Sequence, residues 1–152
     1  MQKLRRKENT KIGYYSFEYR RIGRNRLFDE SFIYSTSDKD KQLSASKYGE
    51  FAIFNADLLK NKFQADKYFV KAIKRDPNNS FWLGNYAVFL HFYKKEINLA
   101  QRFYIQSLKV FKEDPFLLFN YSILLIFELK KYEKAEKFLK LAIEFDPDFT
   151  KY

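Results

Sequence analysis

The sequence predicts an all-α body built from three antiparallel helix-turn-helix hairpins, preceded by an extended basic N-terminal tail. Three observations lead to this prediction. The body matches itself when it is shifted by 35 residues, and each unit contains two blocks of apolar residues at helical spacing. The 152 residues include only 4 Gly and 3 Pro beside 18 Phe and 12 Tyr, which favours helices joined by short turns.

Residues 1–34 form the first predicted region, a basic tail rich in arginine and aromatic residues. Residues 1–26 hold nine basic residues against Glu8 and Glu18. The alternation of Tyr15, Phe17 and Tyr19 with polar residues predicts an extended segment with one aromatic face. Because arginine pairs bidentately with phosphate and aromatic rings stack on unpaired bases, the tail is predicted to contact RNA. The predicted contacts are Arg5, Arg6, Lys7, Lys11, Tyr15, Phe17, Tyr19, Arg20, Arg21, Arg24 and Arg26. A disordered solubilising segment and a tail that binds an acidic protein are the alternatives.

Residues 35–45 form a polar connector, because Ser35 to Lys41 consists of residues that favour turns and solvent. The helical domain is predicted to extend from residue 46 to residue 152. Its units are superimposed by the 35-residue shift without a gap. The matched columns are Tyr48, Leu83 and Leu118; Phe51, Tyr86 and Tyr121; Ala52, Ala87 and Ser122; Ala65, Ala100 and Ala135; Phe69, Tyr104 and Leu139; and Ala72, Ser107 and Ala142.

The small residues in these columns have a packing role. Two antiparallel helices approach closely only where one supplies a small residue and its partner fills the gap. Within each unit, the lysine-rich stretches at 60–62, 94–96 and 130–131 predict the turn between the two helices. The pairs Asp76-Pro77, Asp114-Pro115 and Asp146-Pro147 are predicted to close the units, with Asp capping and Pro stopping or starting a helix. The second helix of the middle unit is expected to run about one turn longer, up to Pro115.

This pattern resembles the tetratricopeptide repeat over residues 46–147. Leu83 and Leu118 match its Trp site, Ala87 and Ser122 its Gly site, and Ala100 and Ala135 its characteristic Ala site. The sequence departs from the pattern at Asn55, which takes the usual Tyr position, and by one extra residue between the two helices of a unit. The resemblance implies a short right-handed solenoid that binds other proteins.

The resemblance also implies a concave groove lined by the first helix of each repeat. The matching positions are Phe81, Asn85, Val88, His91, Phe92, Leu117, Asn120, Ile123, Ile126 and Phe127. The alternative interpretation of each large side chain among them is that it packs in the core of the array and does not line a groove. Asn85 and Asn120 stand where groove asparagines of such repeats hold a bound peptide backbone. The first repeat has Glu50 there, which argues against a groove that clamps a terminal carboxylate.

Composition argues against several other functions. With no cysteine and His91 as the single histidine, neither a disulfide framework nor a metal site is expected. His91 has no catalytic partner at helical spacing and is predicted to be a hydrogen-bonded structural residue. No set of nucleophile, base and orienting group is present, so the protein is predicted to be a non-enzyme without cofactor, metal or small-molecule substrate. The uncharged stretch from Pro115 to Phe127 is too short to span a membrane, and the N-terminus is not expected to be a secretory signal.

The predicted function is that of a structural adaptor subunit in a large ribonucleoprotein, most concretely a mitochondrial ribosomal protein. In this hypothesis the tail contacts rRNA and the repeats contact a neighbouring protein. The cysteine-free, Phe-rich and Lys-rich composition favours a mitochondrial location, with the cytoplasm as the alternative. The rival function is a pure protein-interaction scaffold in a respiratory, ciliary or chaperone complex, with the tail on an acidic protein surface.

Overall fold

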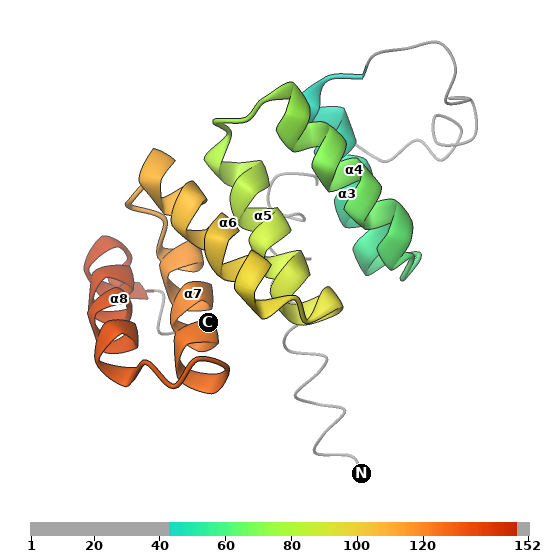
Figure 1. The fold of residues 1–152 in the computed structure, drawn as a ribbon. Coiled ribbons are helices and arrows are strands. Elements are labelled where there is room, and N and C mark those ends of the chain that lie inside the picture. Colours follow the sequence, from blue (N-terminus) through green and yellow to red (C-terminus); the bar gives the residue numbers. More distant parts are fainter. Residues whose placement is uncertain (1–42, 149–152) are drawn as a thin grey trace.

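The computed structural model describes residues 43–148, and it shows an all-α array of three hairpins (Figure 1). The elements are α3 (Ala45–Asp57), α4 (Lys62–Arg75), α5 (Ser80–Phe89) with its π-helical extension η1 (Leu90–Lys94), α6 (Ile97–Val110), α7 (Pro115–Phe127) and α8 (Tyr132–Phe145). The predicted all-α helical repeat is therefore confirmed. The predictions for the tail at 1–34, and for all but the last three residues of the connector at 35–45, fall outside the described residues.

The helices pair as α3 with α4, α5 with α6, and α7 with α8, and the pairs lie side by side along the array (Figure 1). The turns within the three hairpins, residues 58–61, 95–96 and 128–131, lie along one edge, which we call the turn edge. The loops between hairpins, residues 76–79 and 111–114, lie along the opposite edge, the loop edge. None of the helices between residues 43 and 148 combines the length and apolarity that crossing a bilayer requires.

Four of the six α-helices begin at a side-chain cap. The side chains of Ser44, Asn61, Asn79 and Asp114 accept hydrogen bonds from the backbone N–H three residues ahead, at 3.2, 3.1, 3.2 and 3.0 Å. These bonds satisfy amides that have no partner within the helix. The predicted capping role holds for Asp114, but Asn79, not Asp76, caps the helix that follows Pro77. Asp76 instead accepts a hydrogen bond from the Asn79 amide at 2.9 Å.

The prediction of an extended second helix in the middle hairpin was wrong. Helix α6 ends at Val110 and has 14 residues, the same length as α4 and α8. The difference lies in the position of the proline. Pro115 is the first residue of α7, where its missing N–H costs no hydrogen bond, whereas Pro77 lies in the loop itself.

Each hairpin turn contains a lysine in the left-handed backbone conformation. Lys60, Lys95 and Lys130 have φ angles of 53°, 61° and 55°. In each turn the next residue donates its N–H to a carbonyl six residues back, on Asn55, Leu90 or Leu125, at 2.8, 3.0 and 2.8 Å. This closing bond satisfies a terminal carbonyl of the first helix.

Small residues form the contact between the two helices of a hairpin, as the columns predicted. Ala52, Ala65, Ala87 and Ala100 are fully buried. In the third hairpin, the Ser122 hydroxyl lies 3.3 Å from the carbonyl oxygen of Ala135 across the helix pair, and it donates to the Leu118 carbonyl at 2.8 Å. The predicted register of the columns is therefore the register of the helix packing.

Glycines allow one close contact at each junction between successive hairpins. A Cβ atom at Gly49 would overlap the ring of Trp82, and one at Gly84 would lie 2.8 Å from Leu117. In both pairs the glycine and its partner are 33 residues apart in sequence, so the first helix of the next hairpin packs on the first and second hairpins in the same way. The third hairpin has Phe119 at the matching position. Aromatic pairs repeat beside this contact, with ring centroids 5.4 Å apart for Phe69 and Tyr86 and 5.5 Å apart for Tyr104 and Tyr121.

The left-handed lysines lead to a stability prediction. Left-handed backbone costs an L-residue about 1 kcal/mol, and glycine avoids this cost. We expect Lys130→Gly to raise the free energy of unfolding by about 1 kcal/mol, measured by urea denaturation followed by circular dichroism. Lys131→Gly is the control, because Lys131 has a φ of −97° and gains nothing from glycine. Equal effects of the two substitutions would show that the left-handed conformation carries no strain in solution.

Candidate protein-binding surface

A row of phenylalanine side chains runs along the first helices of the second and third hairpins. It consists of Phe81 and Phe92 on α5–η1 and of Phe116 and Phe127 on α7, which occupy equivalent positions 35 residues apart. Phe81 is 38% exposed and Phe127 is 61% exposed, while Phe92 and Phe116 are half-buried. We call these four residues, together with Asn85 and Asn120 between them, the phenylalanine stripe.

The two asparagines of the stripe adopt the same arrangement. Nδ2 of Asn85 donates to the Phe81 carbonyl and Nδ2 of Asn120 to the Phe116 carbonyl, each at 2.8 Å. A carboxamide has two donor hydrogens and an acceptor oxygen, so this bond fixes the side chain without using its whole capacity. Asn85 is half-buried and Asn120 is 7% exposed, which makes Asn85 the more accessible of the two.

Several of the predicted groove residues are core residues instead. Val88, His91 and Leu117 are 1%, 1% and 2% exposed, and Asn120 is 7% exposed. Leu117 lies against Gly84 of α5, whereas His91 lies within its own hairpin, 3.3 Å from the Tyr104 hydroxyl. The prediction that these four residues line an open groove was therefore wrong. Phe81, Asn85, Phe92, Ile123, Ile126 and Phe127 keep exposed or half-exposed side chains. Phe116 was not among the predicted groove residues, although it lies 35 residues after Phe81 and so occupies the equivalent position.

The first hairpin continues the stripe with acidic residues in place of phenylalanine and asparagine. Glu50 matches Asn85, and Asp57 matches Phe92. Glu50 forms an ion pair with Lys47 at 2.8 Å. Asp57 accepts a hydrogen bond from the Tyr93 hydroxyl at 2.7 Å, and burial raises the pKa of its carboxyl group. One end of the surface is thus acidic and the remainder is aromatic.

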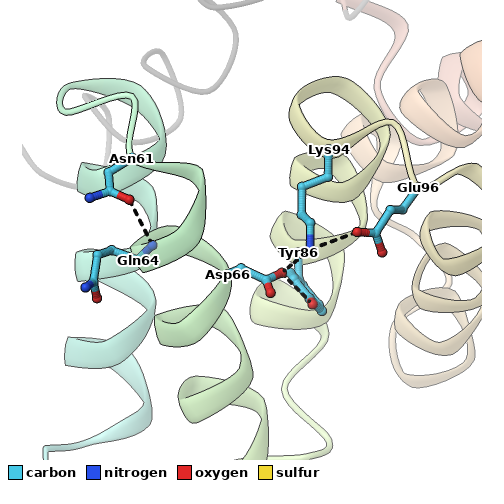
Figure 2. A network of polar contacts seen from close by, with 6 residues as sticks. All are labelled: Asn61, Gln64, Asp66, Tyr86, Lys94 and Glu96. Carbon is cyan, nitrogen blue, oxygen red and sulfur yellow. Dashed lines mark hydrogen bonds and ion pairs between the residues drawn. The ribbon is translucent and has the colours of Figure 1, made fainter.

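A polar network behind the stripe joins the first two hairpins (Figure 2). The Tyr86 hydroxyl donates to Asp66 at 2.9 Å, and the Lys94 ammonium lies 3.2 Å from Asp66 and 2.8 Å from Glu96. The same figure shows the Asn61 cap on the Gln64 amide. One repeat later, the matching contact links Gln101 to the Tyr121 hydroxyl at 3.3 Å. Neighbouring hairpins are therefore held in one relative position at both joints.

Three tyrosines of this region are held in the neutral form. Burial raises the pKa of Tyr86 and Tyr93 well above the usual tyrosine value, and the hydrogen bond to an aspartate adds a smaller increase. Burial alone raises the pKa of Tyr104, which lies within hydrogen-bonding distance of His91, 3.3 Å from its Nδ1 atom. The His91 ring also stacks on Phe92, with centroids 4.0 Å apart. The predicted structural role of His91 agrees with this buried position.

Comparison with known proteins places the array in a class. The tetratricopeptide repeat family model matches residues 117–149, a range that contains nearly all of α7 and the whole of α8. Together with the three equivalent hairpins, this match to the last hairpin supports a tetratricopeptide repeat assignment, and such repeats typically serve in protein interaction. A search of curated proteins found no match to the chain. The predicted RNA contacts, from Arg5 to Arg26, lie outside the described residues.

The buried phenols predict that the fold weakens at alkaline pH. A group whose pKa is higher in the folded state than in the unfolded state contributes to stability. This contribution is complete below the pKa of the unfolded state, about 10 for tyrosine, and is lost as the pH rises through the pKa of the folded state. We expect the free energy of unfolding to fall steadily above pH ~10. The Tyr93→Phe variant should show a shallower fall and should lose about 1–3 kcal/mol at neutral pH, because Asp57 is left without its donor. Urea denaturation across this pH range tests both effects.

The control for this experiment is Tyr132→Phe, since Tyr132 is 60% exposed. This variant should match the unsubstituted protein in stability. If Tyr93→Phe and Tyr132→Phe behave alike, the hydrogen bond between Tyr93 and Asp57 does not contribute to the stability of the first joint.

Proposed function

We propose that the protein is a non-enzymatic adaptor that binds an apolar segment of a partner protein along the phenylalanine stripe. The observation that carries this proposal is the recurrence of exposed Phe81 and Phe127, with Phe92 and Phe116, at matched positions on two successive hairpins. Aromatic side chains that remain partly in water gain free energy when a partner covers them. Contiguous exposed apolar surface of this kind is typical of interaction sites.

The chemistry of the stripe limits the partner segment. Phenylalanines on α5–η1 and α7 favour apolar side chains, and Asn85 offers an amide to a peptide backbone. At the α3 end, Glu50 and Asp57 disfavour a carboxylate and favour a basic residue. The segment that fits best is therefore an extended, internal apolar stretch with a lysine or arginine near the first hairpin.

The finer proposal is that this adaptor belongs to a ribonucleoprotein, with the N-terminal tail on RNA. Six of the eight arginines of the chain lie within residues 1–26, whereas the rest of the chain carries its basic charge almost entirely on lysine. Arginine is the better partner for phosphate and for stacked bases. We propose a mitochondrial ribosome as the assembly, on the basis of the basic tail and the cysteine-free, Phe-rich and Lys-rich composition. The rival is a protein-only scaffold with its tail on an acidic protein.

Selection from a random peptide library tests the stripe. We expect apolar and aromatic peptides to be enriched, and their affinity should be the same with a free or an amidated C-terminus, because the surface has no carboxylate clamp. Phe81→Ala and Phe127→Ala should each lower the affinity about tenfold, since truncating a buried interface anchor typically costs at least 1 kcal/mol. Titration calorimetry provides the measurement. Phe111→Ala, on the loop edge, is the matched control, and a loss of affinity there equal to that at Phe81 contradicts the proposed site.

Deleting residues 1–34 tests the RNA contact. The truncated protein should keep its helical circular dichroism and lose most of its affinity for single-stranded RNA. Each lost phosphate contact should reduce the log–log salt slope by about 0.7. Replacing Arg20, Arg21, Arg24 and Arg26 by lysine keeps the charge, so weaker binding would show that arginine geometry matters. Unchanged RNA binding after truncation argues against the tail, and no RNA binding by either form favours the protein-only scaffold.

A further inference from the structure

The most exposed large apolar side chains of the described residues all lie at the turn edge. Leu58, Leu59 and Phe63, at the α3–α4 turn, are 68%, 57% and 77% exposed. Phe127 and Tyr132, at the α7–α8 turn, are 61% and 60% exposed. Every other exposed large apolar side chain between residues 43 and 148 is at most 49% exposed. Exposure of this degree, concentrated on one edge, requires an explanation other than chance placement.

The fold itself does not need these apolar residues. Phe63 is matched by Asn98 and Glu133 in the other two hairpins, both polar. Leu59 is matched by Lys94 in the second hairpin, which forms the same closing hydrogen bond in its turn, and by the half-buried Leu129 in the third. Packing and turn geometry are therefore compatible with polar residues at both positions. The apolar side chains at the α3–α4 turn point to a contact outside the chain.

Lysines accompany the apolar residues at the same edge. The three turns and their immediate flanks contain six of them: Lys60, Lys62, Lys94, Lys95, Lys130 and Lys131. Their five acidic neighbours are Asp57, Asp66, Glu96, Glu128 and Glu133, of which Asp57 is bonded to Tyr93, while Asp66 and Glu96 both pair with Lys94. The left-handed conformation places Lys60, Lys95 and Lys130 at equivalent points of the three turns. The turn edge therefore combines exposed apolar side chains with a bias toward positive charge.

We propose that the turn edge docks on an anionic membrane surface. The three turns lie in a row along one side of the array, so they can reach a flat surface together (Figure 1). Leu58, Leu59, Phe63 and Tyr132 would enter the boundary between headgroups and acyl chains, while the lysines remain at the level of the lipid phosphates. Each lysine near an anionic surface contributes attraction, and the apolar side chains add burial.

This inference goes beyond the adaptor function and is independent of it. Only Phe127 belongs to both surfaces, because it ends α7 beside the turn. The experiment therefore uses Phe63 and Leu59, which lie outside the phenylalanine stripe. A failed membrane test leaves peptide binding by the stripe unaffected.

Fluorescence at single engineered cysteines tests the docking in the full-length chain, which has no cysteine of its own. An environment-sensitive dye on Phe63→Cys should shift to shorter wavelength and brighten with vesicles of phosphatidylcholine and phosphatidylserine, and much less with phosphatidylcholine alone. The same dye on Phe111→Cys, which lies on the loop edge and is 49% exposed before substitution, should not respond. A tail that merely tethers the protein would sediment it with vesicles without changing the dye at position 63, and this outcome overturns the proposal.

Vesicle sedimentation of matched variants supplies the second measurement. Leu59→Ser combined with Phe63→Ser should weaken binding about tenfold or more through lost apolar burial. Lys60→Gln combined with Lys62→Gln should weaken it about fivefold for each lysine replaced. The control is Val110→Ser combined with Phe111→Ser, on the loop edge, with circular dichroism confirming the fold of each protein. Equal binding by the turn-edge and loop-edge variants, or no preference for anionic vesicles, contradicts membrane docking through the turn edge.

Discussion

The close contact between successive hairpins is the constraint on which the other features of this structure depend. Gly49 receives Trp82 and Gly84 receives Leu117, so each following helix sits against backbone and not against a side chain. Aromatic pairs of Phe69 with Tyr86 and of Tyr104 with Tyr121 fill the space beside these contacts. Because the two joints share one geometry, residues 35 apart in sequence remain aligned in space. The phenylalanine stripe and the turn edge both follow from this alignment.

The two joints differ in polarity, and this difference makes the array asymmetric. The first joint buries Asp57 and Asp66 against Tyr93 and Tyr86, whereas the second uses the neutral pair Gln101 and Tyr121. A partly buried carboxylate is tolerated only when it is hydrogen-bonded, so the tyrosines and the aspartates depend on one another. As a result, the surface changes from acidic at α3 to aromatic at α5 and α7. In the proposed adaptor, this change in polarity would give a bound segment a preferred direction.

Two candidate interaction surfaces therefore belong to different parts of the same helices. The stripe lies along the first helix of each hairpin, and the turn edge lies where those helices end. Phe127 is the residue at which they meet. A protein docked through its turns would keep Phe81 and Asn85, at the other end of α5, available to a partner. The arrangement suits an adaptor that holds a protein segment close to a surface.

The sequence alone determined the repeat, the helix pairs and the small-residue columns, since periodicity and side-chain volume are local properties that the fold preserves. It also predicted a hydrogen-bonded structural role for His91, but it placed this residue in the groove and not in the core. The tertiary structure decided which side of each first helix is open. Val88 and Leu117 match groove positions on a single helix, but both are buried in the array, Leu117 against Gly84 of α5. The structure also revealed the left-handed lysines, which the sequence does not signal because lysine has no preference for that conformation. It placed the end of α6 at Val110, whereas in the sequence the charged loop that follows resembles a continuing helix. Which helix faces are exposed and how the turns fold depend on how the hairpins pack on one another. This packing is set by contacts between residues that are distant in sequence.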